Sequence, residues 1–149
     1  MYLLIYKEDQ ILLAMKKRGF GEGKWNGVGG KVNADETIEL AALRELKEEI
    51  GVESKEEHLE SMGILKFRSE NSKFNWDCHV YFLKSWQGEP TESEEMRPQW
   101  YSFDQIPFGS MWVDDKYWLP LVIGGDKINA DFFFNNEGNE ILKMNIKKI

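Results

Sequence analysis

The sequence lacks several features that mark special classes of protein. Its 149 residues include a single cysteine, Cys78, so no disulfide can form within the chain, as is usual in a reducing compartment. No apolar run approaches the roughly 20 residues that a membrane-spanning helix needs. The first residues show neither a basic leader nor a small-residue cleavage site, so we expect a strand there and no signal peptide. These absences predict a cytoplasmic protein, with Cys78 as a buried strand residue more simply than as a catalytic thiol.

Positive charge is also scarce, because the chain has 19 lysines and arginines but 26 aspartates and glutamates, which gives a net charge of −7. A long phosphate backbone requires clustered basic side chains, so we expect no nucleic-acid polymer as a partner. A small phosphorylated ligand is compatible with this charge, because carboxylates can hold it through divalent cations. The composition, 42% hydrophobic and 30% charged, is that of an ordinary globular protein. We expect residues 1–149 to form one domain and a monomer, with no membrane partner.

The pattern of apolar and turn residues predicts many strands and two helices. The predicted strands lie at 2–6, 11–15, 59–68, 75–86, 99–103, 131–134 and 141–146, the last two forming a closing hairpin. The glycine-containing stretch 25–32 is expected to be irregular. A first-turn cluster of acidic residues and a glycine stop predict a helix over 37–50, and a second helix is predicted over 112–123. The expected fold class is α/β or α+β, an α/β/α sandwich with a mixed β-sheet.

Several glutamates in the first predicted helix lie beside its apolar face. With about 100° per residue, Glu45 and Glu49 fall within about 20° of Ile38. On the same helical wheel, with Ile38 at zero and about 3.6 residues per turn, Glu48 lies near −80°. A solvated face is the simpler interpretation, but like charges four residues apart repel, and partial burial adds to the cost. A bound Mg²⁺ ion, which prefers oxygen ligands, removes this conflict, so we predict that Glu45, Glu48 and Glu49 are metal-binding and catalytic residues.

The loop before this helix supplies further candidates. Gly29 and Gly30 allow the backbone to approach a metal or a phosphate, and a free carbonyl there is a hard oxygen ligand. A simple turn is an equally good interpretation of the two glycines. Glu36 and Arg44 are eight residues apart, too far for a pair within one helix, so an ion pair between them would brace the loop.

The segment from Gly30 to Val52 matches the Nudix signature at every fixed position: Gly, five residues, Glu, seven residues, Arg-Glu-aliphatic-any-Glu-Glu-any-Gly-aliphatic. The matching residues are Gly30, Glu36, Arg44, Glu45, Leu46, Glu48, Glu49, Gly51 and Val52. The chain therefore resembles the Nudix hydrolases, which implies their α/β/α sandwich with the signature as a loop-helix-loop motif. It also implies hydrolysis of a nucleoside diphosphate linked to another group, with Mg²⁺ or Mn²⁺ as cofactor. The implied roles are metal binding for Glu45, Glu48, Glu49 and the Gly30 backbone, and structural support for Glu36 and Arg44.

A wider resemblance covers most of the chain. Segments 15–21, 25–27, 94–98, 105–108 and 111–115 are similar to the animal-type members of this family, which hydrolyse oxidised purine nucleoside triphosphates. The resemblance assigns the binding of the base to the positions of Asn26, Trp112, Asp114 and Asp115, and part of the pocket lining to that of Phe20.

The same residues have a chemical interpretation of their own. Trp112 offers a flat apolar face on which a purine can stack. Asp114 and Asp115 accept hydrogen bonds, and either becomes a donor as well if it is held protonated. Asn26 can donate and accept, and Lys16 can contact a phosphate. The structural alternatives are that the two aspartates cap the second helix, that Trp112 belongs to the core and that Lys16 is solvated.

The expected function is Mg²⁺-dependent hydrolysis of an oxidised purine nucleoside triphosphate, such as 8-oxo-dGTP, to the monophosphate and pyrophosphate, which sanitises the nucleotide pool. Glu48, Glu49 or Glu95 is expected to take a proton from the attacking water. One alternative is another substrate, such as ADP-ribose, a dinucleoside polyphosphate or an ordinary dNTP. The other is a sensor that binds a nucleotide without cutting it.

Some residues depart from the resemblance or have simpler roles. Met1, residues 67–69 and Trp76 differ from the animal-type relatives, and these differences concern the preference for the base rather than hydrolysis. Trp86 and Trp118 are expected to be packing residues.

Overall fold

The computed structural model describes all residues from Met1 to Ile149 and shows a mixed α+β fold with two helices. Three short 3-10 helices, η1 (Glu56–His58), η2 (Phe103–Gln105) and η3 (Phe108–Ser110), connect the longer elements. The chain divides into two compact units, residues 1–60 with 81–111 and residues 61–80 with 112–149, which are described separately. Neither helix has the length and hydropathy that a membrane span needs.

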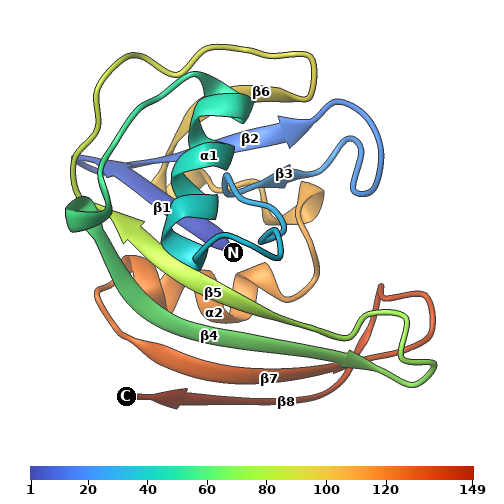
Figure 1. Cartoon of the computed structure of the whole chain (residues 1–149). Helices are drawn as coiled ribbons and strands as arrows, with labels where there is room; N and C mark the ends of the chain where they lie inside the picture. The colour runs from blue at the N-terminus through green and yellow to red at the C-terminus, as the bar shows by residue number, and fades with distance from the viewer. The chain divides into compact units, whose positions relative to one another are not determined.

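Strand β2 (Gln10–Lys16) is the central strand of the first unit (Figure 1). It pairs antiparallel along its whole length with β6 (Met96–Ser102). Its start pairs with β1 (Tyr2–Lys7) and its end with β3 (Trp25–Asn26), both antiparallel. Pro98 is tolerated within β6 because this strand pairs with β2 alone and the missing N–H falls on its open side.

Helix α1 (Ile38–Ile50) begins and ends at caps that the sequence specifies. The hydroxyl of Thr37 accepts a hydrogen bond from the N–H of Leu40 at 3.2 Å. Gly51 ends the helix in the left-handed conformation, with φ of 70°, where a side chain would be strained. Its N–H donates to the carbonyl of Lys47 at 3.0 Å.

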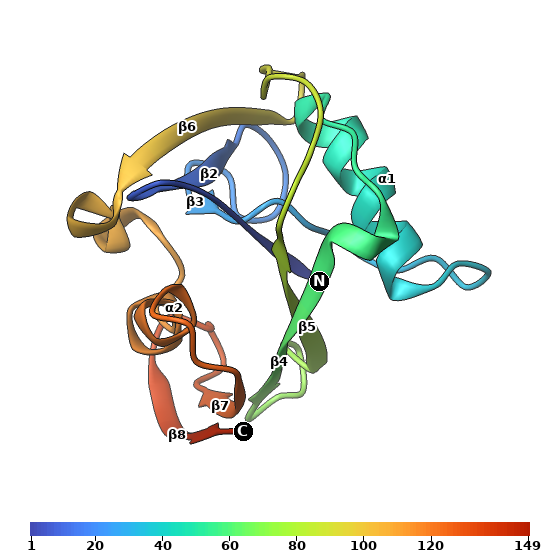
Figure 2. The same ribbon diagram turned by 90° about the vertical axis from the view of Figure 1, so that its left-hand side faces the viewer.

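One face of α1 packs on the strands of the first unit (Figures 1 and 2). Ala42, Leu46 and Ile50 are fully buried in a cluster with apolar residues of β1 and β2. Burying a side chain such as Leu46 or Ile50 contributes roughly 1.5–3 kcal/mol. This packing fixes the rotation of the helix about its axis, and therefore the direction of each glutamate that it carries.

The second unit is a mixed sheet with one helix. Strand β4 (Leu59–Ser69) pairs parallel with β7 (Ile128–Phe134), and β7 pairs antiparallel with β8 (Ile141–Lys148). Strand β5 (Trp76–Leu83) neighbours β4 in the strand order, and both strands extend from this unit into the first. Helix α2 (Asp115–Ile123) packs against β7.

Apolar side chains of the second unit alternate along β7 as expected for a strand with one buried face. Phe132 and Phe134 are buried, and each ring stacks on Phe67 of β4 with ring centroids 5.8 Å apart.

Trp118 of α2 is completely buried, which confirms its predicted packing role. Cys78 is partly buried rather than fully buried as predicted, and desolvation still raises the pKa of its thiol to about 11, so it stays protonated.

The structure confirms the predicted fold class, the first helix and the closing hairpin, and corrects several boundaries. The second helix begins at Asp115 rather than at residue 112, because residues 112–115 form a turn in which the N–H of Asp115 donates to the carbonyl of Trp112 at 3.1 Å. Strand β6 begins at Met96, three residues before the predicted start, despite its proline. A two-residue strand, β3, lies in the stretch predicted to be irregular, where it pairs with the end of β2.

Candidate active site

The predicted ion pair between Glu36 and Arg44 is present and ties the loop before α1 to the helix. The Arg44 guanidinium donates to both carboxylate oxygens of Glu36, from Nη2 at 2.6 Å and from Nε at 3.1 Å. Arg44 also donates to the carbonyl of Lys31 at 3.0 Å, and Glu36 accepts from the N–H of Asn33 at 2.9 Å. Arg44, followed by the Asn33 N–H, holds the pKa of Glu36 below its ordinary value. The ionised Glu36–Arg44 pair therefore holds the loop at its start, through Lys31, and at its end, through Glu36.

Glu49 is the buried carboxylate of α1, with 2% of its surface exposed. Its Oε1 accepts a hydrogen bond from the N–H of Gly29 at 3.3 Å, while its Oε2 is buried without a partner. Burial, and then the neighbouring carboxylate of Glu45, raise the pKa of Glu49 to about 9. The Gly29 N–H and the positive charge of Lys16 act in the opposite direction but do not compensate. An ionised Glu49 therefore requires a positive charge that the protein itself does not supply.

The other two glutamates of the signature differ from Glu49 in exposure. Glu45 is mostly buried, and its Oε1 accepts from Nη1 of Arg44 at 2.9 Å. Glu48 has 60% of its side chain exposed, and its Oε2 lies 3.3 Å from the same nitrogen of Arg44. No group of three or more histidine, cysteine, aspartate or glutamate side chains is arranged as a ready metal site. The structure thus brings Glu45 and Glu49 together and leaves Glu48 exposed beside Arg44.

Gly29 and Gly30 serve close approaches of the backbone, not merely a turn. A Cβ at Gly30 would lie 2.6 Å from Oε1 of Glu45, and one at Gly29 would lie 2.0 Å from the carbonyl oxygen of Met1. The carbonyl of Gly30 accepts a hydrogen bond from the Met1 amino group at 2.9 Å. Gly30, whose carbonyl was proposed from sequence as a metal ligand, therefore lies next to Glu45, and Met1 occupies one acceptor position of that carbonyl.

These donors fit a hard divalent cation. Glu49 offers a buried, unpartnered carboxylate oxygen, Glu45 offers a second carboxylate beside it, and Gly30 offers a carbonyl. Carboxylate and carbonyl oxygens are the ligands that Mg²⁺ and Mn²⁺ prefer. A cation at this position would provide the charge that an ionised Glu49 needs.

The first unit also positions three of the predicted substrate-binding residues. Lys16, at the end of β2, is near enough to Glu49 for its charge to lower the pKa of that carboxyl. The Asn26 side chain accepts a hydrogen bond from the N–H of Gly27 at 3.0 Å, and Phe20 is 63% exposed on the loop between β2 and β3.

Arg97 is a basic neighbour of Lys16 that the sequence analysis did not single out. Lys16, Lys17 and Arg97 all line an open pocket of about 370 Å³ in the first unit. Arg97 lies over the ring of Trp25, 5.3 Å from its centroid. The only signal for Arg97 in the sequence was its place within the segment 94–98 that resembles the animal-type enzymes.

In the second unit, the two adjacent aspartates make different contacts. Oδ2 of Asp114 accepts a hydrogen bond from the indole N–H of Trp118 at 2.9 Å. Oδ2 of Asp115 accepts from the backbone N–H of Trp112 at 3.1 Å. Asp114 stands at the N-cap of α2 but makes no side-chain capping bond, so helix capping is not its role. Burial raises the pKa of Asp114 to about 6 although the Trp118 bond acts against it, so this buried carboxyl is partly protonated near neutral pH.

Residues 1–122 match the NUDIX domain family, so the chain belongs to the Nudix family and is a Nudix hydrolase. Enzymes of this family generally depend on divalent metal ions. The oxidized purine nucleoside triphosphate hydrolase of Mus musculus is 44% identical over 147 residues, which cover 99% of this chain and 92% of that protein.

Two solved structures place the fold among known ones. The mutator MutT protein of Bacillus halodurans is similar with a TM-score of 0.83 and 26% identity, over 98% of this chain and 95% of that one. A bifunctional NMN adenylyltransferase/ADP ribose pyrophosphatase of Francisella tularensis, complexed with AMP and a manganese ion, shares the fold at a TM-score of 0.63. Its identity is 20%, over 83% of this chain and 40% of that one.

Proposed function

We propose that this Nudix hydrolase cleaves oxidised purine nucleoside triphosphates, such as 8-oxo-dGTP, to the monophosphate and pyrophosphate. The observation that carries the choice of substrate is the 44% identity, over 99% of the chain, to an oxidized purine nucleoside triphosphate hydrolase. The buried carboxylate of Glu49, beside the partly buried one of Glu45, favours hydrolysis over mere binding, because a sensor has no need to keep Glu49 in a costly position.

The metal in this proposal is Mg²⁺, with Mn²⁺ as a substitute. Glu45, Glu49 and the carbonyl of Gly30 would hold it, and Glu48 would join them by leaving Arg44. When bound, such an ion neutralises charge on the bridging phosphates and lowers the pKa of a coordinated water.

The side chains around the glutamates have distinct tasks in this proposal. Glu49 must lose its proton before it can act as a ligand, since only the ionised carboxylate binds a cation well. Glu48, Glu49 or Glu95 takes the proton of the attacking water; Glu95 is exposed, 3.7 Å from Arg18. Lys16 binds a phosphate oxygen in this proposal, because its positive charge is near enough to Glu49 to lower the pKa of that carboxyl.

Recognition of the base is assigned residue by residue from the resemblance. In the second unit, Trp112 stacks on the purine, and Asp114 and Asp115 bind its polar edge. A protonated Asp114 can donate to a base acceptor, which an ionised carboxylate cannot do. In the first unit, Asn26 can donate to and accept from a base, and Phe20 contributes apolar lining, as the resemblance assigns to their positions.

A substrate panel tests the proposal. We expect kcat/KM in Mg²⁺ to be highest for 8-oxo-dGTP or 2-hydroxy-dATP, above dGTP and ADP-ribose, with pyrophosphate as the second product. Glu49→Gln should lower kcat by orders of magnitude while the fold is retained. Preference for ADP-ribose would contradict the substrate, and nucleotide binding without pyrophosphate release would contradict the enzyme.

We further propose that residues 1–149 act as one domain, as a cytoplasmic monomer that binds no nucleic-acid polymer. The net charge of −7 supports the last point, since a phosphate backbone would be repelled. Light scattering after gel filtration tests the monomer, and a binding titration with single-stranded DNA at low salt tests the exclusion of polymers.

A further inference from the structure

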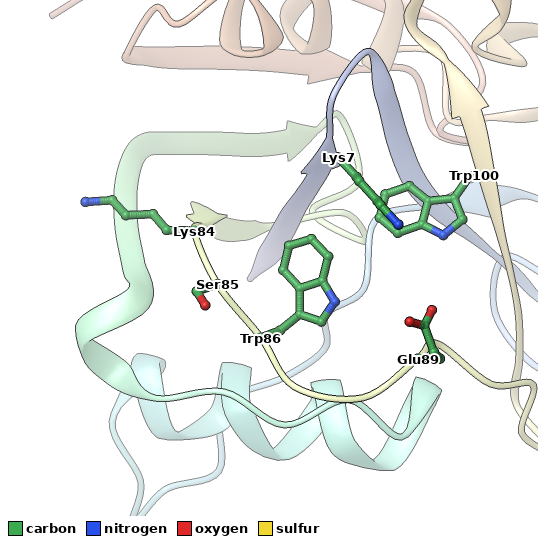
Figure 3. A pocket seen from close by; sticks show the side chains of 6 residues that line it. All are labelled: Lys7, Lys84, Ser85, Trp86, Glu89 and Trp100. Atoms are coloured by element: carbon green, nitrogen blue, oxygen red, sulfur yellow. The ribbon is translucent and has the colours of Figure 1, made fainter.

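A second open pocket, of about 310 Å³, lies in the first unit and shares no residue with the glutamate site. Figure 3 shows its lining, which comes from the end of β1, the segment after β5 and strand β6. The lining residues are Lys7, Lys84, Ser85, Trp86, Glu89 and Trp100. Its volume is at the lower end of the range for small-molecule sites, about 300–1,000 Å³.

Two tryptophans form the apolar wall of this pocket. The rings of Trp86 and Trp100 are 6.2 Å apart between centroids and tilted by 30°. Both pack against the buried core cluster of the first unit and remain partly exposed on their other side. Trp86, expected from sequence to be a packing residue, therefore also presents indole surface to the solvent. A fixed indole of this kind can stack a nucleobase, at about 1–3 kcal/mol per base.

Two groups of opposite charge flank the indoles. Lys7 and Glu89 are both exposed, and neither forms an ion pair within the chain. In Figure 3 the Lys7 side chain extends toward Trp100, and Glu89 lies near the same ring. Lys84, by contrast, points away from the tryptophans in Figure 3 and pairs with Glu60 at 3.5 Å. The pocket thus offers one free ammonium group and one free carboxylate beside an aromatic wall.

From this combination we propose that the pocket binds a guanine mononucleotide. Glu89, which only accepts hydrogen bonds, suits the adjacent N1–H and N2–H groups of guanine. Adenine places an acceptor nitrogen beside its amino group, which a carboxylate repels. The indoles bind the ring, and Lys7 binds the phosphate. A purely cationic ligand is disfavoured by Lys7, and a purely anionic one by Glu89.

The pocket can be tested without the metal site and therefore independently of the proposed hydrolysis. The protein is titrated in EDTA with GMP, AMP and guanosine while the indole N–H signals of Trp86 and Trp100 are followed by NMR. The variants Trp86→Phe and Trp100→Phe assign the two signals. We expect both to shift saturably with GMP, at least about tenfold more tightly than with AMP, because a bidentate contact discriminates by about 1–3 kcal/mol.

Surface variants separate the two polar contacts. Glu89→Ala should reduce the affinity for GMP to that for AMP, and Lys7→Ala should reduce it to that for guanosine. Glu57→Ala, an exposed glutamate outside the pocket, is the matched control and should change neither. Shifts confined to the Trp112 indole, equal affinities for GMP and AMP, or no saturable shift at Trp86 and Trp100 would each overturn the proposal. Hydrolysis by Glu89→Ala should equal that of the wild type, so failure of the pocket leaves the proposed enzyme function intact.

Discussion

Replacing Glu49 by glutamine should stabilise the metal-free protein while it abolishes hydrolysis. The folded carboxyl has a pKa of about 9, against an ordinary value of 4.5, because it is buried and lies beside Glu45. Folding therefore raises the pKa, and between these two values the folded chain holds a proton that the unfolded chain has lost. Stability then falls as pH rises through this interval, and Glu49 becomes progressively more unfavourable.

The magnitude follows from the length of that interval. Each pH unit between 4.5 and the working pH costs about 1.4 kcal/mol, so at pH 7 the carboxyl destabilises the fold by on the order of 3 kcal/mol. Glutamine is neutral at every pH. Its amide oxygen can still accept from the N–H of Gly29, and its amide group can donate to Glu45. The glutamine variant should therefore gain most of this free energy at pH 7 and little of it below pH 4.5.

Urea denaturation in EDTA at pH 4.5, 7 and 9 measures the effect. With a slope of about 2 kcal/mol per molar, the midpoint at pH 7 should rise by about 1–2 M in the variant. Glu48→Gln is the matched control, because its side chain is 60% exposed on the same helix and its midpoint should barely move. A Glu49→Gln protein that is less stable than wild type at all three pH values would refute the argument. If the argument holds, added Mg²⁺ should stabilise the wild-type protein but not the Glu49→Gln variant.

Three further outcomes are expected. Gly30→Ala places a methyl group 2.6 Å from Oε1 of Glu45 and should lower kcat at least tenfold with the circular dichroism spectrum unchanged, whereas Gly109→Ala, with nothing within 4 Å, should be neutral. Asp114→Asn removes a carboxyl whose folded pKa is about 6 against 3.8, so its free energy of unfolding should improve relative to wild type as pH rises from 4 to 7, and a pH-independent difference would contradict this. Arg44→Lys cannot keep the bidentate contact with Glu36 in the loop. Limited proteolysis before α1 should therefore become faster, and the concentration of Mg²⁺ for half-maximal activity should rise. An unchanged rate of proteolysis would show that another contact holds the loop.

Local patterns in the sequence were enough for the elements of the site. Helix α1, its stop at Gly51 and the Glu36–Arg44 pair all follow from spacing and residue type, because their interactions connect residues at most eight positions apart. The closing hairpin could also be predicted, because its two strands follow one another directly in the chain. The local patterns did not predict the exact ends of some elements. One example is the start of α2 at Asp115, because residues of a turn and of a first helical turn have similar sequences.

Other features were decided only when distant segments packed together. The buried, unpartnered oxygen of Glu49 could not be read from the helix alone, because the strands and the loop at Gly29 determine how much of the side chain water reaches. The pocket at Trp86 and Trp100 likewise joins residues of different strands and a connecting segment.

The sequence by itself determined the family, the type of donor atoms at the site and the order in which they occur. The tertiary structure alone decided which of the three glutamates is buried, that Arg44 contacts the other two, and how far the pKa of Glu49 departs from its ordinary value. The reason is physical: a residue's chemistry is fixed by its covalent structure, but desolvation and charge interactions depend on what surrounds it in three dimensions.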